Sequence, residues 1–553
     1  MLRAESQNLC TAPLFITYVK AHNRNTHNEM ADQLAKEAQP ITPPLAISKV
    51  STNLPEQPSE GEKETTRKLK VQSYTCSSHR GCNFLAHLHT HNLAKLQEVT
   101  PNSAAFWNQL QVLQGGSKKN NPLSASDLAS VFSVHMNPPL IPPENFNQES
   151  ISEKVRRASL IPPITQPLPS VKQQVTAEDI EEAKANLLKK SSSSKGIDNI
   201  GKDLIMQMDN DKLAKLFNAC LDERDSPLAW LVSHITAILK KGKDPSDPNG
   251  YWAVSLESCI LKMFTYIIHK YIYSWAVNLN LIPPSQNGFC PEYHTNNNAF
   301  VLRTIIEKSQ AEGKYVWLAF VDISNAFPSI THSLLWLKLH NNGLTGKLFD
   351  WIRRLCTDME YVVESNGEYS MSFKARMGVL MGDPASPTLW LLYMHDFALK
   401  EHPDDISLMV TVISHLEHAD DVVLISSSCH SLQFHLDTFA KWCSENALVV
   451  NGLKSWAMVF GPLISQLPIL TLAGEIAQYT KQHTYVGITF CSTECNIFAA
   501  HFSRITTEAQ KNANAVLSIE SVVGSLLPES ARILYTARVD PYLVNGCDIM
   551  LDL

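Results

Sequence analysis

Three aspartates stand at the ends of two short apolar stretches. Asp322 closes the run YVWLAFVDI of residues Tyr315–Ile323, which is rich in β-branched and aromatic residues and is typical of a buried strand. Asp420 and Asp421 occupy the centre of LEHADDVVLIS, residues Leu416–Ser426, where strand-like sequence on both sides of Asp-Asp predicts a tight hairpin. If these strands are neighbours, the carboxylates meet at one edge of a sheet.

Carboxylates that meet in this way repel one another, which raises their pKa values unless cations lie between them. Oxygen-only ligation suits Mg²⁺, which keeps water ligands and accepts substrate phosphates. Two such ions about 3.5–4 Å apart can activate an attacking hydroxyl group and stabilise the leaving oxygen of a phosphoryl transfer. The alternative is that Asp-Asp is ordinary turn sequence and that Asp322 only ends a strand.

Helical periodicity flanks both predicted strands. The predicted helices are His332–Asn342, Ser386–Lys400 and Ser431–Glu445, and a long, half-buried helix is predicted earlier, over Ser258–Trp275. Short strands interleaved with helices indicate an α+β fold, and we expect a sheet with helices covering one side.

Half of the 30 prolines lie between residues 40 and 169. Because proline pairs favour extended backbone, residues 41–175 are predicted to be a Pro-rich linker with short helices, one of them at Ser124–Met136. From about residue 176 the pattern is that of a compact domain, with helices predicted at Ala177–Leu188 and Leu204–Leu221.

The composition is that of an ordinary globular protein. Of 553 residues, 44% are hydrophobic and 18% charged, which excludes wholesale disorder and a collagen-like chain. No apolar run approaches the roughly 18–20 residues that span a bilayer, and no secretory signal is visible. The 12 cysteines form no CxxC pair, so we expect reduced thiols in an intracellular protein without a membrane partner. The net charge of −7 argues only weakly against a nucleic acid partner, since an acidic chain can hold a local basic channel.

Five short motifs follow one another in order along the second half of the chain. They are FVDISNAFPSI (Phe320–Ile330), GVLMGDPASPTLW (Gly378–Trp390), HADDVVL (His418–Leu424), NGLKS (Asn451–Ser455) and YVGITF (Tyr485–Phe490). Two more lie upstream, PNGYWAVSLESCILKMF (Pro248–Phe264) and SQNGFCPEYHTNNNAFVLR (Ser285–Arg303). From about Thr176 onward, this ordered set resembles the reverse transcriptase domain of non-LTR (LINE-type) retrotransposons.

The resemblance implies a right-hand polymerase, with fingers and palm over residues 176–495 and a partial thumb over residues 496–553. It implies that the protein is an RNA-directed DNA polymerase that transfers nucleotides with two Mg²⁺ ions, with Mn²⁺ as an alternative metal. Its partners would be an RNA template, a DNA primer and deoxynucleoside triphosphates. No obligate protein partner is indicated.

Carried over by position, the resemblance makes Asp322 and Asp420 metal ligands, with Asp421 beside them. Gly382 would belong to a loop whose backbone approaches the template and the incoming nucleotide. Lys454 would stand near the pyrophosphate leaving group, as a charge stabiliser and general acid. The plainer alternatives are that Gly382 belongs to an ordinary turn and that Lys454 is a solvated loop lysine. Residues Tyr485–Gly487 would form a hairpin that grips the primer end.

Phe327 follows Asp322 by five residues, and the resemblance implies that it packs beneath the incoming sugar and excludes a 2′-hydroxyl group. The alternative is a core residue, although one ring can do both. Arg303 would bind substrate, and together with Lys240, Lys241 and Lys243 it could line a basic path for template and triphosphate.

Several positions depart from the family pattern. Trp252 and Cys290 stand where arginine is common, Met381 replaces a usual glutamine, and His418 stands where an aromatic residue is common. The loss of an arginine removes a bidentate phosphate donor, which would impair the activity. The alternative function is therefore a catalytically decayed, nucleic-acid-binding remnant of such an element.

The N-terminal sequence ITYVKAHNRNTHNEMADQLAKEA (Ile16–Ala38) resembles the C-terminal end of a type 1 ribonuclease H domain, with His22 and Asp32 at the matching positions. Residues 1–40 are therefore expected to be a ribonuclease H remnant, and a surface helix is the alternative. Because that family needs three further carboxylates on a preceding sheet, we expect no hydrolysis of RNA by this fragment and a chain or gene model shortened at its N-terminus.

A group of cysteines and histidines lies within the predicted linker. Its members Cys76, His79, Cys82 and His87 do not have the paired-ligand spacing of zinc modules, so we interpret them as a histidine-rich loop.

Overall fold

The computed structural model describes residues 89–100, 102–113, 121–137, 146–167, 171–189, 195–240 and 242–550. The chain divides into two compact units. The first includes the described residues of 121–501 together with 546–550, and it holds all the predicted polymerase-site residues. The second includes the described residues of 40–120 together with 502–545. The predicted ribonuclease H remnant and the Cys/His group at 76–87 lie outside the described residues.

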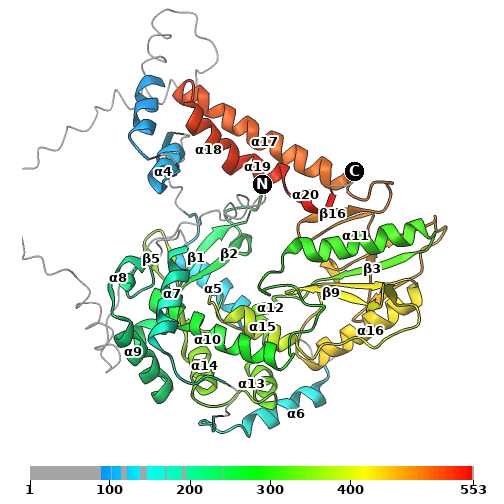
Figure 1. The fold of residues 1–553 in the computed structure, drawn as a ribbon, viewed down its shortest axis with the longest axis horizontal. Helices are drawn as coiled ribbons and strands as arrows, with labels where there is room; N and C mark the ends of the chain where they lie inside the picture. Colours follow the sequence, from blue (N-terminus) through cyan, green and yellow to red (C-terminus); the bar gives the residue numbers. More distant parts are fainter. Residues whose placement is uncertain are drawn as a thin grey trace, which may run out of the picture. The chain divides into compact units, whose positions relative to one another are not determined.

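The central sheet of the first unit has the strand order β14-β11-β3-β10-β9. These strands are β3 (Val316–Val321), β9 (His415–His418), β10 (Asp421–Ser426), β11 (Trp456–Phe460) and β14 (Gln478–Tyr479). Two of them, β3 and β9, are labelled in Figure 1. Strand β3 lies between β10 and β11 and runs antiparallel to both. The two strand regions that carry the aspartates are therefore direct neighbours, and the predicted hairpin is β9–β10.

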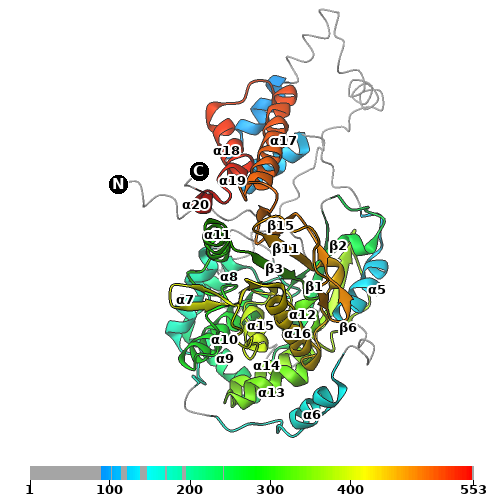
Figure 2. The same ribbon diagram turned by 90° about the vertical axis from the view of Figure 1, so that its right-hand side faces the viewer.

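All six residues of β3 are buried, so both faces of this strand need a cover. Residues Trp317, Ala319 and Val321 share a hydrophobic core with residues of α16 (Cys429–Glu445). Helix α11 (Thr295–Ala311) lies on the other side of the sheet, as Figures 1 and 2 show together. The expectation of helices on one side only is therefore wrong, because a strand without apolar–polar alternation is apolar on both faces.

A second sheet of the first unit has the order β2-β1-β4-β5, with β6 also paired to β4. Its strands are β1 (Val232–Leu239), β2 (Tyr251–Leu256), β4 (Glu360–Ser365), β5 (Glu368–Tyr369) and β6 (Phe373–Lys374). Strands β1 and β2 form an antiparallel hairpin, whereas β1 runs parallel to β4, which is distant in the sequence. No sequence pattern predicted this sheet, because its central pairing depends on residues far apart in the chain.

Besides α11 and α16, the helices of the first unit are α5 (Ala125–Met136), α6 (Gln148–Ser159), α7 (Ala177–Lys189), α8 (Lys202–Gln207), α9 (Asn210–Glu223), α10 (Cys259–Asn278), α12 (Ala326–Ser329), α13 (His332–Asn341), α14 (Lys347–Asp358), α15 (Ser386–Met394) and α20 (Cys547–Met550). Six of them, α5, α7, α8, α10, α13 and α15, begin within two residues of a predicted helix, whereas no helix was predicted at α6, α12, α14 or α20. The single helix predicted over Leu204–Leu221 is in fact two. Asp209 interrupts it, because its side chain accepts a hydrogen bond from the Lys212 N–H and thereby caps α9.

The described residues of the interval 121–175, which was expected to be a linker with short helices, contribute ordered structure to the first unit. Helix α5 begins with a capping box between Ser124 and Asp127, and its residues Leu128 and Phe132 are part of the main hydrophobic core. Thr165 donates its N–H and its hydroxyl group to the buried carboxylate of Asp350 in α14, at 2.8 and 3.0 Å. This interval is therefore attached to the domain by both apolar and polar contacts.

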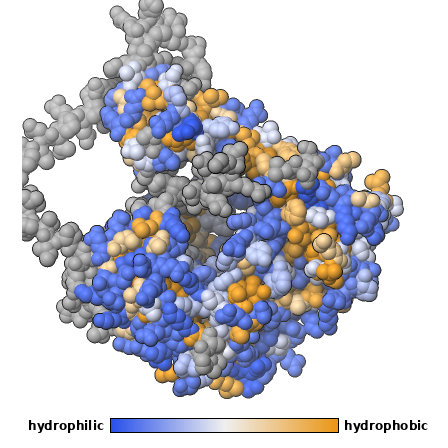
Figure 3. All heavy atoms as spheres, viewed as in Figure 1, coloured by the Kyte–Doolittle hydropathy of each residue, from blue (hydrophilic) through white to orange (hydrophobic). Residues whose placement is uncertain are grey.

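The described part of the second unit is helical. It consists mainly of α4 (Ala104–Leu113), α17 (Ala499–Val523, which begins in the first unit), α18 (Pro528–Arg538) and α19 (Asp540–Leu543). Its small core contains Leu96, Phe106, Leu110, Ile519, Val523 and Leu534. Across the described residues, no helix combines the length and the apolar character needed to cross a membrane. On the surface in Figure 3, hydrophobic residues lie in separate small groups among hydrophilic ones.

Candidate active site

The turn between β9 and β10 brings the three aspartates together. Val422 pairs with Val321, so the next position along the ladder sets Asp421 opposite Asp322. Residues that face each other in an antiparallel pair have Cα atoms about 4.5–5.5 Å apart. Asp420 lies in the short turn that connects His418 to Asp421, which pair with each other. The carboxylates thus lie at one edge of the central sheet.

The local electrostatics are those of crowded acids. Burial raises the pKa of Asp420, and the negative charge of Asp322 adds to this effect. Desolvation raises the pKa of Asp421 to about 6, and the charges of Asp420 and Asp322 add to it, although the residue retains access to solvent. The three carboxyl groups therefore lie close enough to repel one another when ionised, and a cation bound at this edge of the sheet would neutralise their charge.

The donor chemistry fits Mg²⁺. Asp322 and Asp420 would supply carboxylate oxygens, and water and substrate phosphates would fill the remaining positions, as Mg²⁺ prefers. Among the described residues, His, Cys, Asp and Glu side chains form no group of three or more that could hold a metal ion by themselves.

The loop before β11 is fastened to the end of β3. The Asn451 N–H donates to the Asp322 carbonyl at 2.8 Å, and the Asp322 N–H donates to the Ser455 hydroxyl group at 3.2 Å. Lys454 lies in the 3₁₀ turn between these contacts, and its Nζ is 3.9 Å from Asp322 Oδ2. Because the Lys454 side chain is 72% exposed, the ion pair contributes little stability, and the ammonium group can reach a phosphate that arrives from solvent.

Phe327 is half-buried between two other aromatic rings. Its ring centre is 5.9 Å from that of Phe289, in an edge-to-face arrangement, and 5.8 Å from that of Trp390, in a stacked arrangement. The Phe327 carbonyl accepts a hydrogen bond from the Val379 N–H at 3.1 Å. The ring is thus held in place from two sides, as a steric barrier would need to be.

Gly382 has a φ of +90°, a conformation that favours glycine. A Cβ atom at this position would come within 3.3 Å of the Ser255 carbonyl oxygen, so this turn lies directly against β2. Arg303 lies in α11, where its Nε donates to Glu307 at 2.9 Å and its Nη1 donates to the Ile549 carbonyl of α20. Its guanidinium group therefore takes part in the packing of α20 against α11.

The two positions that lack the family's arginine differ in exposure. Trp252 is 62% exposed, and Lys240 Nζ lies 4.7 Å from the centre of its ring. Cys290 is buried, with Sγ 3.4 Å from the Gln286 carbonyl oxygen. A cation is therefore present beside Trp252, from the residue that follows the neighbouring strand β1, whereas an arginine at position 290 would need space that is filled.

The aspartate turn is supported by residues that no sequence pattern singled out. The Gln286 side-chain oxygen accepts the N–H groups of Gly288 and Ala419, both at 2.8 Å, and its amide nitrogen donates to Glu417 and to the Ala419 carbonyl, both at 3.2 Å. A Cβ atom at Gly288 would lie only 2.0 Å from the Ala419 nitrogen. The only signal for these roles was the SQNGF sequence within an upstream motif.

A hairpin is present at the position predicted for it, as β15 (Gln482–Tyr485) and β16 (Ile488–Cys491). Val486 and Gly487 form its tip, with φ values of 43° and 89°. The buried Tyr485 hydroxyl group accepts a hydrogen bond from Asn298 Nδ2 at 3.0 Å, and the same nitrogen donates to the Glu417 carbonyl at 2.9 Å. The hairpin is therefore coupled to β9 through α11.

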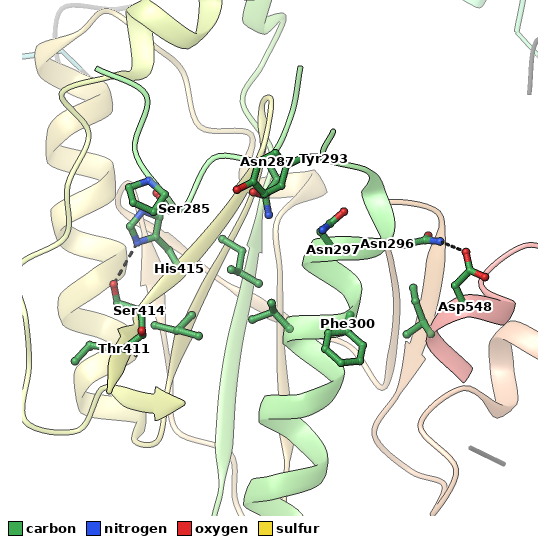
Figure 4. Close-up of a pocket in the computed structure, with 16 residues that line it drawn as sticks. Ser285, Asn287, Tyr293, Asn296, Asn297, Phe300, Thr411, Ser414, His415 and Asp548 are labelled. Atoms are coloured by element: carbon green, nitrogen blue, oxygen red, sulfur yellow. Dashed lines mark hydrogen bonds between the residues drawn. The ribbon is translucent and has the colours of Figure 1, made fainter. Parts of the chain in front are cut away.

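A cavity of about 530 Å³ lies elsewhere in the first unit, and Figure 4 shows its lining. Helix α11 contributes Asn296, Asn297 and Phe300, and the stretch from Thr411 to Leu416 contributes the opposite wall. That stretch includes β8 (Thr411–Ile413), the partner of β7 (Ile406–Leu408). Asn296 donates to Asp548 of α20 at 3.4 Å. None of the predicted polymerase-site residues lines this cavity.

Comparison with known proteins is consistent with this geometry. Residues 238–490 match the family described as reverse transcriptase (RNA-dependent DNA polymerase). The RNA-directed DNA polymerase from mobile element jockey of Drosophila melanogaster is 25% identical over 354 residues, 63% of this chain and 38% of that protein. The corresponding jockey protein of Drosophila funebris is 27% identical over 62% of this chain and 38% of its own length.

A third relative is the probable RNA-directed DNA polymerase from transposon BS of Drosophila melanogaster, which is 26% identical over 407 residues. That match covers 71% of this chain and 43% of the relative, so the chain spans about two fifths of the length of these proteins. With the aspartates gathered at the edge of the central sheet, residues 238–490 are a reverse transcriptase domain, and the chain is similar to the RNA-directed DNA polymerases of mobile elements.

Proposed function

We propose that this protein is the RNA-directed DNA polymerase of a retrotransposon-derived element. The observation that carries the proposal is the register of β3 and β10, which sets Asp421 opposite Asp322 with Asp420 in the adjoining turn. This arrangement lies inside the reverse transcriptase domain. The substrates would be an RNA template, a DNA primer and deoxynucleoside triphosphates, and the primer 3′-hydroxyl group would attack the α-phosphate.

In this proposal Asp322 and Asp420 hold the metal, and Asp421 beside them is the third carboxylate of the metal site. When bound, two Mg²⁺ ions would favour ionisation of the primer hydroxyl group and neutralise charge on the phosphates. Lys454, exposed and 3.9 Å from Asp322, would bind the pyrophosphate as it leaves and supply a proton to it. Phe327 would lie under the sugar, and Gly382 would let the backbone approach the nucleotide.

The subdomains of a right-hand polymerase follow from these roles. The central sheet with α11 and α16 would be the palm, and the sheet of β1, β2 and β4 with its helices would be the fingers. The helices α17 and α18 would be part of a thumb. Arg303, bonded to Glu307 and Ile549, would act on substrate only after leaving these partners, so Lys240 and Lys243 are the better basic groups for the nucleic acid path.

A catalytically decayed remnant is the second candidate, because the buried Cys290 stands where the family commonly has arginine. Primer extension on an RNA template with purified protein and Mg²⁺ separates the two. The active polymerase extends the primer, Asp420→Ala abolishes extension, and the exposed Asp437→Ala in α16 does not. Extension that survives Asp420→Ala would refute the assigned site.

Rescue variants test decay directly. If the wild type does not extend a primer and Trp252→Arg or Cys290→Arg restores extension, the protein is a decayed polymerase. Trp252→Arg is the sharper variant because its side chain is 62% exposed, so the substitution does not disturb the core.

We also propose that residues 1–40 derive from a ribonuclease H domain, with His22 and Asp32 at the matching positions. The support is the sequence resemblance alone. The full chain should then not release fragments from an RNA–DNA hybrid, and Asp32→Asn should leave primer extension unchanged. Hybrid cleavage that is lost in Asp32→Asn would instead show a working nuclease.

A further inference from the structure

Two buried carboxyl groups lie apart from the three aspartates of the metal site. Glu257 joins β2 to α10 and is 2% exposed, and Asp383 follows Gly382 and is 4% exposed. Asp383 Oδ1 accepts the Ala385 N–H at 2.7 Å, at the beginning of α15. Within the described structure, Asp383 Oδ2 and both carboxyl oxygens of Glu257 are buried without a hydrogen-bond donor.

A buried acceptor without a donor lowers the stability of the fold, and two neighbouring charged carboxylates lower it further by repulsion. One proton on the pair removes the repulsion and supplies a donor, because a protonated carboxyl group can donate to its neighbour. Burial raises the pKa of Glu257 well above its ordinary value, and the charge of Asp383 adds to this. Burial also raises the pKa of Asp383.

The groups that face the pair come from α10, α14 and β4. The Thr265 hydroxyl group of α10 lies beside Asp383 and opposes the rise in the pKa of that carboxyl group, but it donates to the Leu261 carbonyl at 3.1 Å. Lys262, one turn along α10, opposes the rise in the pKa of Glu257. Burial raises the pKa values of Cys356 of α14 and Tyr361 of β4, and the charges of both carboxylates add to this, so both groups stay neutral. Lys262 is thus the one cation recorded beside the pair within the described residues, and it is not hydrogen-bonded to any of the three orphaned oxygens.

We propose that Glu257 and Asp383 share one proton, that the Glu257 hydroxyl group donates to Asp383 Oδ2, and that this bond positions the Gly382 turn against β2. Glu257 is therefore a positioning residue: it acts through Asp383 on the backbone at Gly382, whose ideal Cβ position is 3.3 Å from the Ser255 carbonyl oxygen. Asp383 in turn holds the start of α15, the helix that carries Trp390 against Phe327. The consequence for polymerisation rests on the proposed function, whereas the shared proton does not.

The first test is independent of polymerase activity. A carboxyl group whose pKa is raised on folding binds its proton more tightly in the folded state, so the stability of the wild type should fall as pH rises above 4.5, the ordinary value for Glu257. In Glu257→Gln the amide group donates to Asp383 at every pH. Urea titrations at several pH values give the difference in unfolding free energy between the two proteins. The slope of this difference against pH should correspond to the binding of up to one extra proton by the folded wild type. Parallel pH profiles would overturn the shared proton.

The second test concerns positioning and uses single-nucleotide extension. Glu257→Gln should keep kcat/KM close to wild type near neutral pH, and it should lose the decline that the wild type shows on the alkaline side. Glu257→Leu removes the donor and should lower kcat/KM for the nucleotide by about tenfold or more, the effect of a lost hydrogen bond to a charged group. Glu292→Gln, an exposed glutamate, is the matched control.

Equal activity of the Gln and Leu variants would overturn the positioning role. If neither the wild type nor any variant extends a primer, the proposed function fails. The stability comparison still shows whether Glu257 and Asp383 share a proton. If Glu257→Leu does not fold, the pH profiles of wild type and Glu257→Gln still decide it.

Discussion

At the scale of single residues, the site depends on side chains whose surroundings hold them in one place. Phe327 is fixed between Phe289 and Trp390, and Lys454 is exposed on a turn that is fastened to β3 at both sides. The ring is thus part of the scaffold, whereas the exposed lysine is placed by the backbone of its turn and by a weak ion pair with Asp322.

The packing of Phe327 predicts its effect on sugar choice. Phe327→Ala should admit ribonucleotides better by about 1–3 kcal/mol of transition-state free energy, about one to two factors of ten in kcat/KM, with a much smaller loss for deoxynucleotides. Single-nucleotide extension with each sugar measures the ratio. Phe300→Ala, an exposed aromatic residue on α11, is the control. If the variant extends with deoxynucleotides and still rejects ribonucleotides as the wild type does, Phe327 is a core residue only.

At the scale of elements, close contacts between segments hold the aspartate turn. The 286–288 segment lies against the β9–β10 turn. The Gln286 side chain accepts the Ala419 N–H with its oxygen and donates to the Ala419 carbonyl with its nitrogen. Such a turn cannot move without moving Asp420.

Gly288→Ala should therefore disturb the site without touching a carboxylate. The new Cβ atom would lie 2.0 Å from the Ala419 nitrogen, so one backbone must shift. We expect a loss of about 1–3 kcal/mol of stability, as for overpacked cores, and a loss of extension of about a hundredfold, as for ångström-scale misplacement of catalytic groups. Gly201→Ala, which meets only the flexible Lys195 side chain, should behave like the wild type. An active Gly288→Ala would mean that the turn tolerates displacement.

The contact between α13 and the end of α15 contains a buried cation. Lys338 Nζ donates to the Tyr393 carbonyl and to Asp396, both at 2.6 Å, and burial lowers the pKa of Lys338 from 10.5 to about 8. Between these values the unfolded chain binds more protons than the folded one, so this group makes the stability rise with pH from about 8 toward 10.5.

Lys338→Met should remove that rise. The difference in unfolding free energy between wild type and Lys338→Met should be constant below about pH 8 and should increase above it. Urea titrations at several pH values measure it, and Lys400→Met, an exposed lysine, should show a flat difference. A flat difference for Lys338→Met as well would mean that its pKa is ordinary.

At the scale of the whole molecule, segments distant in the sequence complete one domain. The buried Asp350 accepts hydrogen bonds from Thr165 and from the side chains of Arg224 and Arg353. This carboxylate joins the Pro-rich interval to the body of the first unit.

Asp350→Ala should destabilise the first unit by about 3 kcal/mol or more, because it leaves two partly buried arginines without their carboxylate. The urea midpoint measures the loss, and proteolysis should cut near residues 146–167 earlier than in the wild type. Asp358→Ala, a partly exposed partner of Arg354, should cost less than about 1 kcal/mol. A small effect of Asp350→Ala would mean that apolar contacts alone hold the interval.

The local pattern of the sequence determined the strands that carry Asp322 and the Asp420–Asp421 turn, and helices such as α7, α10 and α13. It could do so because hydrophobic periodicity, turn residues and caps act within a few residues of one another. The order of the motifs also pointed to the reverse transcriptase domain, which the family match bears out.

Only the tertiary structure decided which distant segments meet. The parallel pairing of β1 with β4, the second helical cover on β3, the hold of Gln286 on the turn, and the contact of Glu257 with Asp383 all join residues far apart in the chain. Each depends on burial and on the pairing of buried polar groups, which arise only when the chain closes on itself. The sequence by itself thus determined which residues could carry the chemistry, and the packing of the folded chain decided which groups surround them.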